Sequence, residues 1–295
     1  MDTKSSQKVV LITGTSSGIG AALAEEFHTR GFRVIATARN LEAIAHFAEK
    51  GMATYELDVN DFEQMGQVIE QVYITEKRID ILVNNAGYGL MGTLMDLPAA
   101  AIAHQLQTNS IAPVVLTQKV APIMKAEGNG LVINIGSISG VVTTPFAGAY
   151  CASKAALNLF SDTFRMELKP FGIYVMTVQP GAIKSDIGNK AERMATELFP
   201  EDSWYSKIKE GILRRSQASQ VDSTPTKVFA KQLVDTAMKP NPPAIIRLGK
   251  KSFYLPFLYA ILPTPIFEKI LTKKFSLNQL KFDTDGINDL TNHQH

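Results

Sequence analysis

Short runs of β-branched and aliphatic residues recur along this chain, and helix-length segments separate them. Continuous apolar runs of this kind are typical of strands buried on both faces of a parallel sheet. The expected strands cover residues 9–12, 33–37, 53–57, 79–83, 130–135, 173–178 and 244–248. The expected helices cover residues 21–30, 41–50, 61–77, 98–127 and 149–171. This alternation predicts an α/β fold: a doubly wound parallel sheet of about seven strands with helices on both faces.

The first expected strand runs directly into a glycine-rich turn, Thr13–Gly20, and a helix follows. Such a turn lets backbone amides approach a pyrophosphate, and the N-terminus of the helix favours its negative charge. Gly14, Gly18 and Gly20 are therefore candidates for binding a dinucleotide, although their G-x-x-x-G-x-G spacing differs from the commoner G-x-G-x-x-G. The alternative is a plain tight turn.

The end of the second expected strand indicates which dinucleotide is bound. An acidic residue at this point holds the ribose of NAD, whereas an arginine accommodates the 2′-phosphate of NADP. The chain has Arg39 here and no acid before Glu42. We therefore predict NADP(H) as the cofactor; the alternative is that Arg39 is only a solvated charge.

Tyr150 and Lys154 lie four residues apart in an expected helix, so their side chains would share one face. A positive charge ~5 Å from a phenolate contributes ~3 kcal/mol at an effective dielectric of ~20, or about two pKa units. The lysine is thus expected to lower the pKa of the tyrosine and make it an acid–base catalyst. Many helices contain this pair by chance, so the interpretation depends on the other motifs.

The overall composition limits the choice of partner, compartment and metal. A net charge of +2, without a basic block and interleaved aromatics, argues against a nucleic-acid partner. The single cysteine, Cys151, excludes an internal disulfide, and a small buried helix residue is a better interpretation than a redox switch. The polar N-terminus and the short apolar run after it do not resemble a signal peptide, so we expect a cytoplasmic location. The histidines show no metal-ligand spacing, and no metal site is predicted.

Together these motifs resemble those of the short-chain dehydrogenase/reductase family over about residues 9–249. The resemblance implies a single Rossmann-fold catalytic domain over residues 1–249. Besides the glycine turn, it includes an adenine-contacting pair, an Asn-Asn-Ala-Gly segment beside the central sheet, and a Pro-Gly segment that grips the nicotinamide carboxamide. The residues that it implies for cofactor binding are Gly14, Ser16, Ser17, Gly18, Ile19, Gly20, Arg39, Asp58, Val59, Asn85, Ala86, Gly87, Tyr150, Lys154, Pro180, Gly181, Ile183 and Ser185.

The resemblance also implies a catalytic set of Ser137, Tyr150, Lys154 and Asn109. Tyr150 would donate a proton to a carbonyl oxygen, and Ser137 would hydrogen-bond that oxygen. Lys154 would bind the nicotinamide ribose and lower the pKa of the tyrosine, while Asn109, in a bent helix, would hold a proton-relaying water. Ser139 is a rival hydroxyl, but only Ser137 has the spacing of the family. The simpler alternatives are that Ser137 ends a strand and that Asn109 interrupts a helix.

Apolar residues around the expected site favour a hydrophobic small-molecule substrate. Those near the motifs are Leu90, Met91, Val141, Val142 and Phe146. In the family, an insertion such as residues 185–223 forms a lid over substrate; the alternative is a surface helix pair. The apolar side chains of this insertion are Met194, Leu198, Phe199, Trp204 and Tyr205.

A C-terminal extension, residues 250–282, follows the last expected strand and carries an uncharged run between two groups of lysines. The run is short for a bilayer and contains three prolines, so we reject a transmembrane helix. It is either an interfacial segment in peripheral membrane contact or an arm packed on the domain or on a partner subunit. It resembles the tails of some lipid-related family members, including acyl-dihydroxyacetone-phosphate reductases. The polar tail, residues 283–295, is expected to be disordered.

The resulting prediction is an NADP(H)-dependent oxidoreductase that interconverts a hydrophobic secondary alcohol and ketone, or an alcohol and aldehyde, by hydride transfer. Family members commonly pair through the helix around Ala152 and the preceding long helix, so a homodimer or homotetramer is expected. Two alternatives stay open. A sugar-nucleotide epimerase shares the Tyr/Lys pair but favours another glycine spacing and a larger C-terminal domain. An NADPH-binding sensor or scaffold without turnover is the other.

Overall fold

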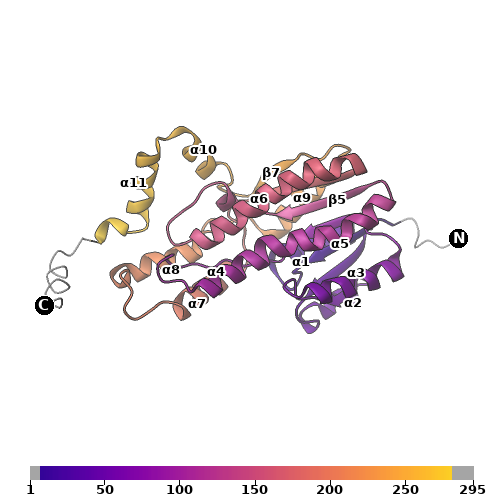
Figure 1. The fold of residues 1–295 in the computed structure, drawn as a ribbon, viewed down its shortest axis with the longest axis horizontal. Coiled ribbons are helices and arrows are strands. Elements are labelled where there is room, and N and C mark those ends of the chain that lie inside the picture. Colours follow the sequence, from indigo (N-terminus) through magenta and orange to yellow (C-terminus); the bar gives the residue numbers. More distant parts are fainter. Residues whose placement is uncertain (1–6, 281–295) are drawn as a thin grey trace, which may run out of the picture.

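The computed structural model describes residues 7–280 and contains a central sheet of seven parallel strands (Figure 1). The strands are β1 (Val9–Thr13), β2 (Arg33–Ala38), β3 (Ala53–Glu56), β4 (Ile81–Asn84), β5 (Gly130–Ile135), β6 (Ile173–Pro180) and β7 (Ile245–Leu248). Their order in the sheet is β3-β2-β1-β4-β5-β6-β7, and every neighbouring pair is parallel. The predicted doubly wound fold is confirmed.

Helices cover both faces of the sheet. They are α1 (Gly18–Thr29), α2 (Ala45–Glu49), α3 (Phe62–Glu76), α4 (Ala99–Leu106), α5 (Ala112–Ala126), α6 (Gly148–Leu168), α7 (Ile187–Glu197), α8 (Lys209–Gln217), α9 (Thr226–Ala237), α10 (Tyr254–Ile261) and α11 (Thr264–Lys274). The long helix predicted over residues 98–127 is interrupted by a π-helical segment, Gln107–Ile111, which separates α4 from α5. Such segments are frequent at functional sites.

The two sides of β1 build two separate layers of the core. Val10 and Ile12 belong to the layer that contains Phe27 of α1 and Phe229 of α9. The alternate residues Val9 and Leu11 belong to the layer formed with α3 and α5. Successive side chains of a strand point to opposite faces, so a fully apolar strand requires cover on both.

The strand order reverses beside β1, because the chain passes from β1 outward to β2 and β3 and then returns to β4 on the other side. In open α/β sheets, ligands bind in the crevice at such a reversal, outside the carboxyl ends of the strands. The topology alone therefore places a binding crevice beyond the ends of β1 and β4.

The C-terminal extension forms two short helices, α10 and α11, which project from the end of the molecule that carries α7 and α8 (Figure 1). Phe267, Leu271 and Phe275 of this extension are buried in one cluster with Ile212 of α8. Pro263 lies at the junction of the two helices, which explains the break. Within residues 7–280, no helix has the length and apolar character needed to cross a membrane. The predicted polar tail, residues 283–295, lies outside the described residues.

Candidate active site

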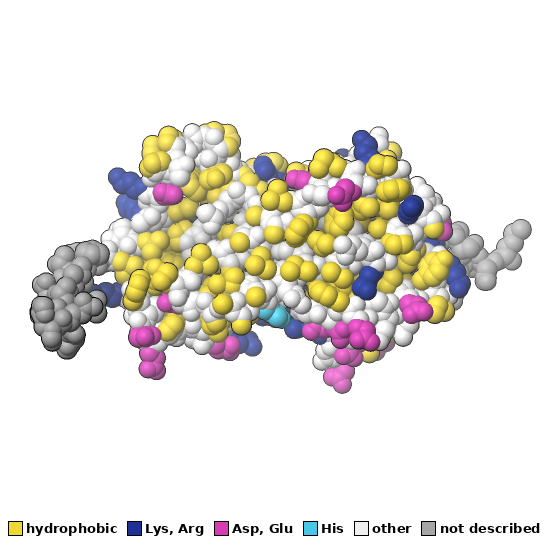
Figure 2. All heavy atoms as spheres, viewed as in Figure 1, with side chains coloured by type: hydrophobic (Ala, Val, Ile, Leu, Met, Phe, Trp, Pro, Cys, Tyr) yellow, Lys and Arg dark blue, Asp and Glu magenta, His cyan; other side chains and the backbone are white. Residues whose placement is uncertain are grey.

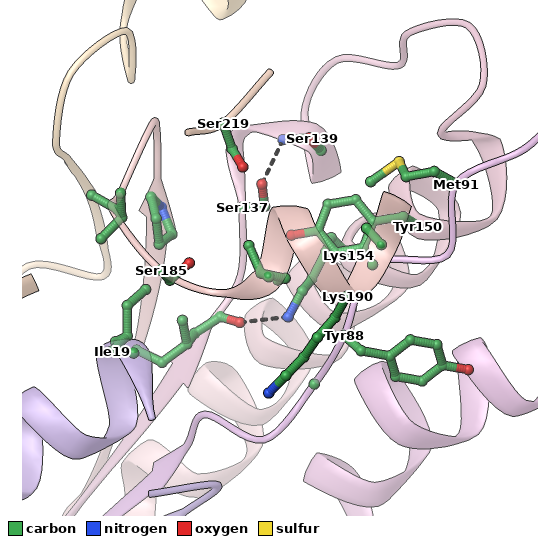
Figure 3. Close-up of a pocket in the computed structure, with 18 of the residues that line it drawn as sticks. Ile19, Tyr88, Met91, Ser137, Ser139, Tyr150, Lys154, Ser185, Lys190 and Ser219 are labelled. Carbon is green, nitrogen blue, oxygen red and sulfur yellow. Dashed lines mark hydrogen bonds between the residues drawn. The ribbon is translucent and has the colours of Figure 1, made fainter. Parts of the chain in front are cut away.

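A cavity of about 840 Å³ opens at the carboxyl ends of the strands. Its walls include the turn after β1, the segments that follow β2, β3, β4, β5 and β6, and helices α4, α6, α7, α8, α10 and α11. Figure 3 shows Ser137, Tyr150 and Lys154 at this cavity, with Ile19 and Ser185 on the side of the glycine turn. All of the predicted site residues except Gly20 and Asn109 line it.

The glycine turn packs against the segment that follows β4. Gly14 has a φ of 70°, and a Cβ there would lie 2.8 Å from the Cα of Ala86. The side-chain amide of Asn85 donates hydrogen bonds of 2.8 and 3.0 Å to the carbonyl oxygens of Thr13 and Gly14. The Asn-Asn-Ala-Gly motif thus holds the turn in place, and only glycine fits at Gly14. Gly20 does not line the cavity because it packs beneath the turn, where a side chain would collide with the carbonyl of Gly14.

The start of α1 suits a phosphate group. Ser17 occupies the N-cap with extended backbone, and its side chain makes no capping hydrogen bond to the helix. The first amides of α1 therefore have no side-chain acceptor, and the helix dipole adds a partial positive charge. Arg39, exposed at the end of β2, supplies a full positive charge to the same cavity. This set of donors fits the phosphates of a dinucleotide.

The catalytic candidates Ser137 and Tyr150 come from two places, the segment just after β5 and the first turn of α6. The Oγ of Ser137 accepts a hydrogen bond of 3.0 Å from the backbone N–H of Ser139. Figure 3 shows the hydroxyl of Ser137 directed toward the amide of Ser139, with the phenol of Tyr150 beside it. The rival, Ser139, acts in this arrangement through its backbone, because its amide orients the hydroxyl of Ser137.

Lys154 lies one turn after Tyr150 and is buried, with 6% of its surface exposed. Its Nζ donates a hydrogen bond of 2.7 Å to the carbonyl oxygen of Ile135, the last residue of β5. Burial without a carboxylate partner lowers the pKa of Lys154 from 10.5 to about 8. A lysine in this state titrates close to neutral pH.

The predicted effect of Lys154 on Tyr150 is wrong for this structure. The pKa of Tyr150 is raised above 10.0, mainly because the phenol is buried, while the hydroxyl of Ser137 and the charge of Arg215 oppose this shift. Lys154 does not lower this pKa, because an ammonium with a pKa of about 8 has lost its charge before a phenol with a pKa above 10.0 ionises. The cation that acts on the phenol comes instead from α8.

Asn109 lies in the π-helical segment, is fully buried and does not reach the cavity wall. Its side-chain oxygen accepts a hydrogen bond of 3.1 Å from the backbone N–H of Tyr88. Its amide donates to the carbonyl of Tyr88 at 2.9 Å and to the hydroxyl of Ser153 at 3.1 Å. In this structure Asn109 therefore joins the segment after β4 to α6, and its predicted water-holding role stays a prediction.

The substrate side of the cavity differs from the prediction in its lining. Of the five apolar residues predicted near the motifs, only Met91 reaches the cavity; the others, Leu90, Val141, Val142 and Phe146, lie behind its wall. In the predicted lid region, Met194 lines the cavity, whereas Leu198, Phe199, Trp204 and Tyr205 do not. Cys151 is buried in the same cluster as Phe146, which fits its interpretation as a small core residue.

Several lining residues were not predicted from the sequence. Those with larger or charged side chains include Tyr88, His104, Thr144, Lys190, Arg193, Arg215, Lys251, Leu255, Leu271, Lys274 and Phe275. Most of them belong to α7, α8, α10 and α11, or lie next to these helices. The sequence of these helices contains no motif, so only the folded arrangement brings their side chains to the cavity.

Comparisons with known proteins identify the family of this chain. The family described as short chain dehydrogenase matches residues 8–196. Short-chain dehydrogenase srdE of Neurospora crassa is 32% identical over 278 residues, which cover 94% of each chain. The NADPH-dependent 1-acyldihydroxyacetone phosphate reductase of Saccharomyces cerevisiae is 28% identical over 284 residues, which cover 93% of each chain.

Among solved structures, a short-chain dehydrogenase from Streptomyces avermitilis is 29% identical to this chain. Its TM-score is 0.75, and the match covers 92% of this chain and 97% of that one. The family match spans more than half of the sequence, and srdE is similar along nearly its whole length. The chain belongs to the short-chain dehydrogenase family of oxidoreductases.

Proposed function

We propose that the protein is an NADP(H)-dependent oxidoreductase that interconverts a hydrophobic secondary alcohol and its ketone, or an alcohol and its aldehyde. The observation that carries this proposal is the meeting of Ser137, Tyr150 and Lys154 in one cavity with the glycine turn and Arg39. A proton donor, a carbonyl-binding hydroxyl and a dinucleotide-binding surface are the parts that carbonyl reduction requires.

The bound nicotinamide supplies or accepts the hydride. In the reductive direction, Tyr150 donates its proton to the carbonyl oxygen of the substrate. Burial favours the neutral phenol, and this suits a proton donor at neutral pH. Ser137 already accepts a hydrogen bond from the N–H of Ser139, so its own O–H is left to bind the same carbonyl oxygen. Lys154 is placed to bind the ribose hydroxyls.

The preference for NADP(H) over NAD(H) is supported by Arg39. It lies at the end of β2, lines the cavity and forms no ion pair with any of residues 7–280. A free arginine at this position can pair with the 2′-phosphate of NADP, which NAD lacks. The Saccharomyces cerevisiae relative is named as an NADPH-dependent reductase, which supports the same preference.

The hydrophobic character of the substrate is supported by apolar side chains from four separate helices or segments. The apolar lining residues on this side are Met91, Met194, Leu255, Leu271 and Phe275. Three of them belong to the C-terminal extension, so this extension takes part in the substrate site.

We also propose that the outer surface of α10 and α11 contacts a membrane that contains anionic lipids. Six large apolar side chains on or beside these helices lie outside the cavity lining and are at least 45% exposed: Phe253, Phe257, Tyr259, Ile261, Ile266 and Ile270. Residues 250–280 contain five lysines and one glutamate, so their net charge complements an anionic surface. Exposed aromatic and aliphatic residues beside lysines are typical of interfacial segments.

We further propose a homodimer or homotetramer in which α5 and α6 pack against a second copy. Figure 2 shows hydrophobic side chains spread over the face formed by these helices. Leu159 and Met166 lie seven residues apart on α6 and are 68% and 70% exposed. Light scattering of the wild type and of a variant with Leu159→Glu and Met166→Glu would test this, since a shared interface predicts a monomeric variant.

The experiment that tests the proposed activity is a spectrophotometric assay of NADPH oxidation against a panel of apolar ketones and aldehydes. NADPH consumption with matching alcohol formation supports the proposal. Binding of NADPH without turnover of any carbonyl would favour the sensor or scaffold instead. Conversion of a nucleotide sugar without net consumption of cofactor would indicate an epimerase.

A further inference from the structure

Arg215 is a buried cation at the catalytic end of the cavity. It belongs to α8, and 8% of its surface is exposed. Its Nε donates a hydrogen bond of 2.8 Å to the hydroxyl of Thr144, in the loop that joins Ser137 to Tyr150. The guanidinium is therefore hydrogen-bonded to the loop that connects the two catalytic hydroxyl groups, those of Ser137 and Tyr150.

No acidic side chain among residues 7–280 forms an ion pair with Arg215. A guanidinium has five N–H donors, and its hydrogen bond to Thr144 uses one of them. Burying a cation without a counter-ion is costly, and burial accordingly lowers the pKa of Arg215. An oxyanion in the cavity would offset this cost.

The wider cavity also favours an anion. Within the described part of the chain, seven basic side chains line it against only two carboxylates, Asp58 and Asp186. Asp186 is paired with Lys190 at 3.9 Å, which leaves an excess of positive charge. Arg39 and the start of α1 serve the phosphates of the dinucleotide at the other end. Arg215 is bonded to Thr144, between Ser137 and Tyr150 in the chain, and lines the same cavity as both, so its ligand belongs to the substrate.

We propose that Arg215 binds an oxyanion of the substrate, so that the substrate is an apolar ketone or alcohol with a carboxylate, phosphate or sulfonate near the reacting carbon. A planar guanidinium binds such groups through two parallel hydrogen bonds. Met194 and Leu271 line the same cavity and suit an apolar chain. This inference rests on the proposed oxidoreductase function and adds the substrate class.

The test compares a medium-chain γ-keto acid with its methyl ester, which has the same carbonyl and chain but no charge. We expect the wild type to prefer the acid in kcat/KM. In Arg215→Met, the ratio of kcat/KM for acid over ester should fall about 10- to 100-fold. Arg215→Lys keeps the positive charge but loses the planar pair of N–H donors, so it should give an intermediate ratio of kcat/KM. Arg214→Met is the matched control, because Arg214 donates to Ser276 and does not line the cavity.

An equal loss for acid and ester in Arg215→Met would overturn the proposal, because a residue that only tunes Tyr150 or holds α8 affects both substrates alike. Calorimetric binding of decanoate and decyl phosphate to the cofactor-loaded protein provides a readout that needs no turnover. Tighter binding of either anion to the wild type than to Arg215→Met supports the anion site, and the tighter ligand identifies the oxyanion. Equal binding to both proteins contradicts it. Absence of turnover with both acid and ester in the wild type would instead count against the proposed activity.

Discussion

The ammonium of Lys154 donates a hydrogen bond of 2.7 Å to the carbonyl oxygen of Ile135, so the catalytic helix α6 is tied to the last residue of β5. Figure 3 shows this bond as a dashed line, with Tyr150 close to the lysine. The same burial that makes the bond possible lowers the pKa of Lys154 to about 8. Lys154 is thus a positioning group whose charge is sensitive to pH in the working range.

This lowered pKa predicts a stability change with pH. Between the folded pKa of about 8 and the unfolded value of 10.5, Lys154 binds more protons in the unfolded chain, so its contribution to the free energy of unfolding rises with pH. The wild type should gain up to about 3 kcal/mol relative to Lys154→Met across this window. Urea unfolding of both proteins at several pH values measures the difference. Lys231→Met, an exposed lysine of α9, should show no such trend. A pH-independent difference for Lys154→Met would contradict the prediction.

Replacing Tyr150 with phenylalanine should remove the proton donor and leave the cavity shape intact. We expect turnover to fall about 100- to 10,000-fold, which is the usual contribution of a general acid. NADPH affinity, measured by fluorescence titration, should stay close to that of the wild type. Tyr174→Phe, on β6 and 46% exposed, is the matched control and should retain activity. Substantial turnover by Tyr150→Phe would contradict the assignment of Tyr150 as the general acid.

Arg39→Asp should change the choice of cofactor. Loss of a charge-assisted hydrogen bond to the 2′-phosphate should lower kcat/KM for NADPH about 10- to 100-fold, and the new carboxylate should improve the use of NADH. Steady-state kinetics with each cofactor at a fixed carbonyl concentration measures both effects. Lys239→Asp makes the same change of net charge at an exposed position outside the cavity and controls for it. Unaltered selectivity in Arg39→Asp would rule out this role.

Membrane contact through α10 and α11 predicts sensitivity to exposed apolar side chains there. In the full chain, Phe257→Ser with Ile266→Ser should reduce co-sedimentation with phosphatidylserine vesicles about 10-fold or more. Tyr73→Ser with Ile74→Ser removes two side chains of similar exposure from the region of α3 and should have no effect. Binding to anionic vesicles should also weaken as salt is added. If both double variants bind vesicles as well as the wild type, or if the wild type does not bind, the membrane proposal fails.

The strands and most helices could be predicted because a strand buried on both faces requires an apolar run, and the chain supplies one for each. The start of β4 shows the limit of this approach. The strand was predicted from Ile79 but begins at Ile81. The reason is Asp80, whose carboxylate accepts a hydrogen bond of 2.7 Å from the backbone N–H of Val9 and pairs with Arg78. A buried carboxylate that bonds a distant backbone group leaves no periodic signal in the sequence.

The cofactor half of the site could be predicted from the sequence far better than the substrate half. Its residues lie in short motifs directly after strands, and parallel strands bring their carboxyl ends to one edge. Arg215 has no such local signature, since it follows Arg214 in a polar helix and only the packing of α8 buries it. The prediction that Phe146 lies at the substrate site was wrong for the opposite reason. It is close to Ser137 and Tyr150 in sequence, but its side chain turns into the cluster beneath the cavity.

The C-terminal extension supplies Leu255, Leu271 and Phe275 to a cavity whose Ser137, Tyr150 and Lys154 come from the central sheet and α6. Substrate selectivity and hydride transfer therefore depend on different segments of the chain. The C-terminal extension can be exchanged without changing Ser137, Tyr150 or Lys154.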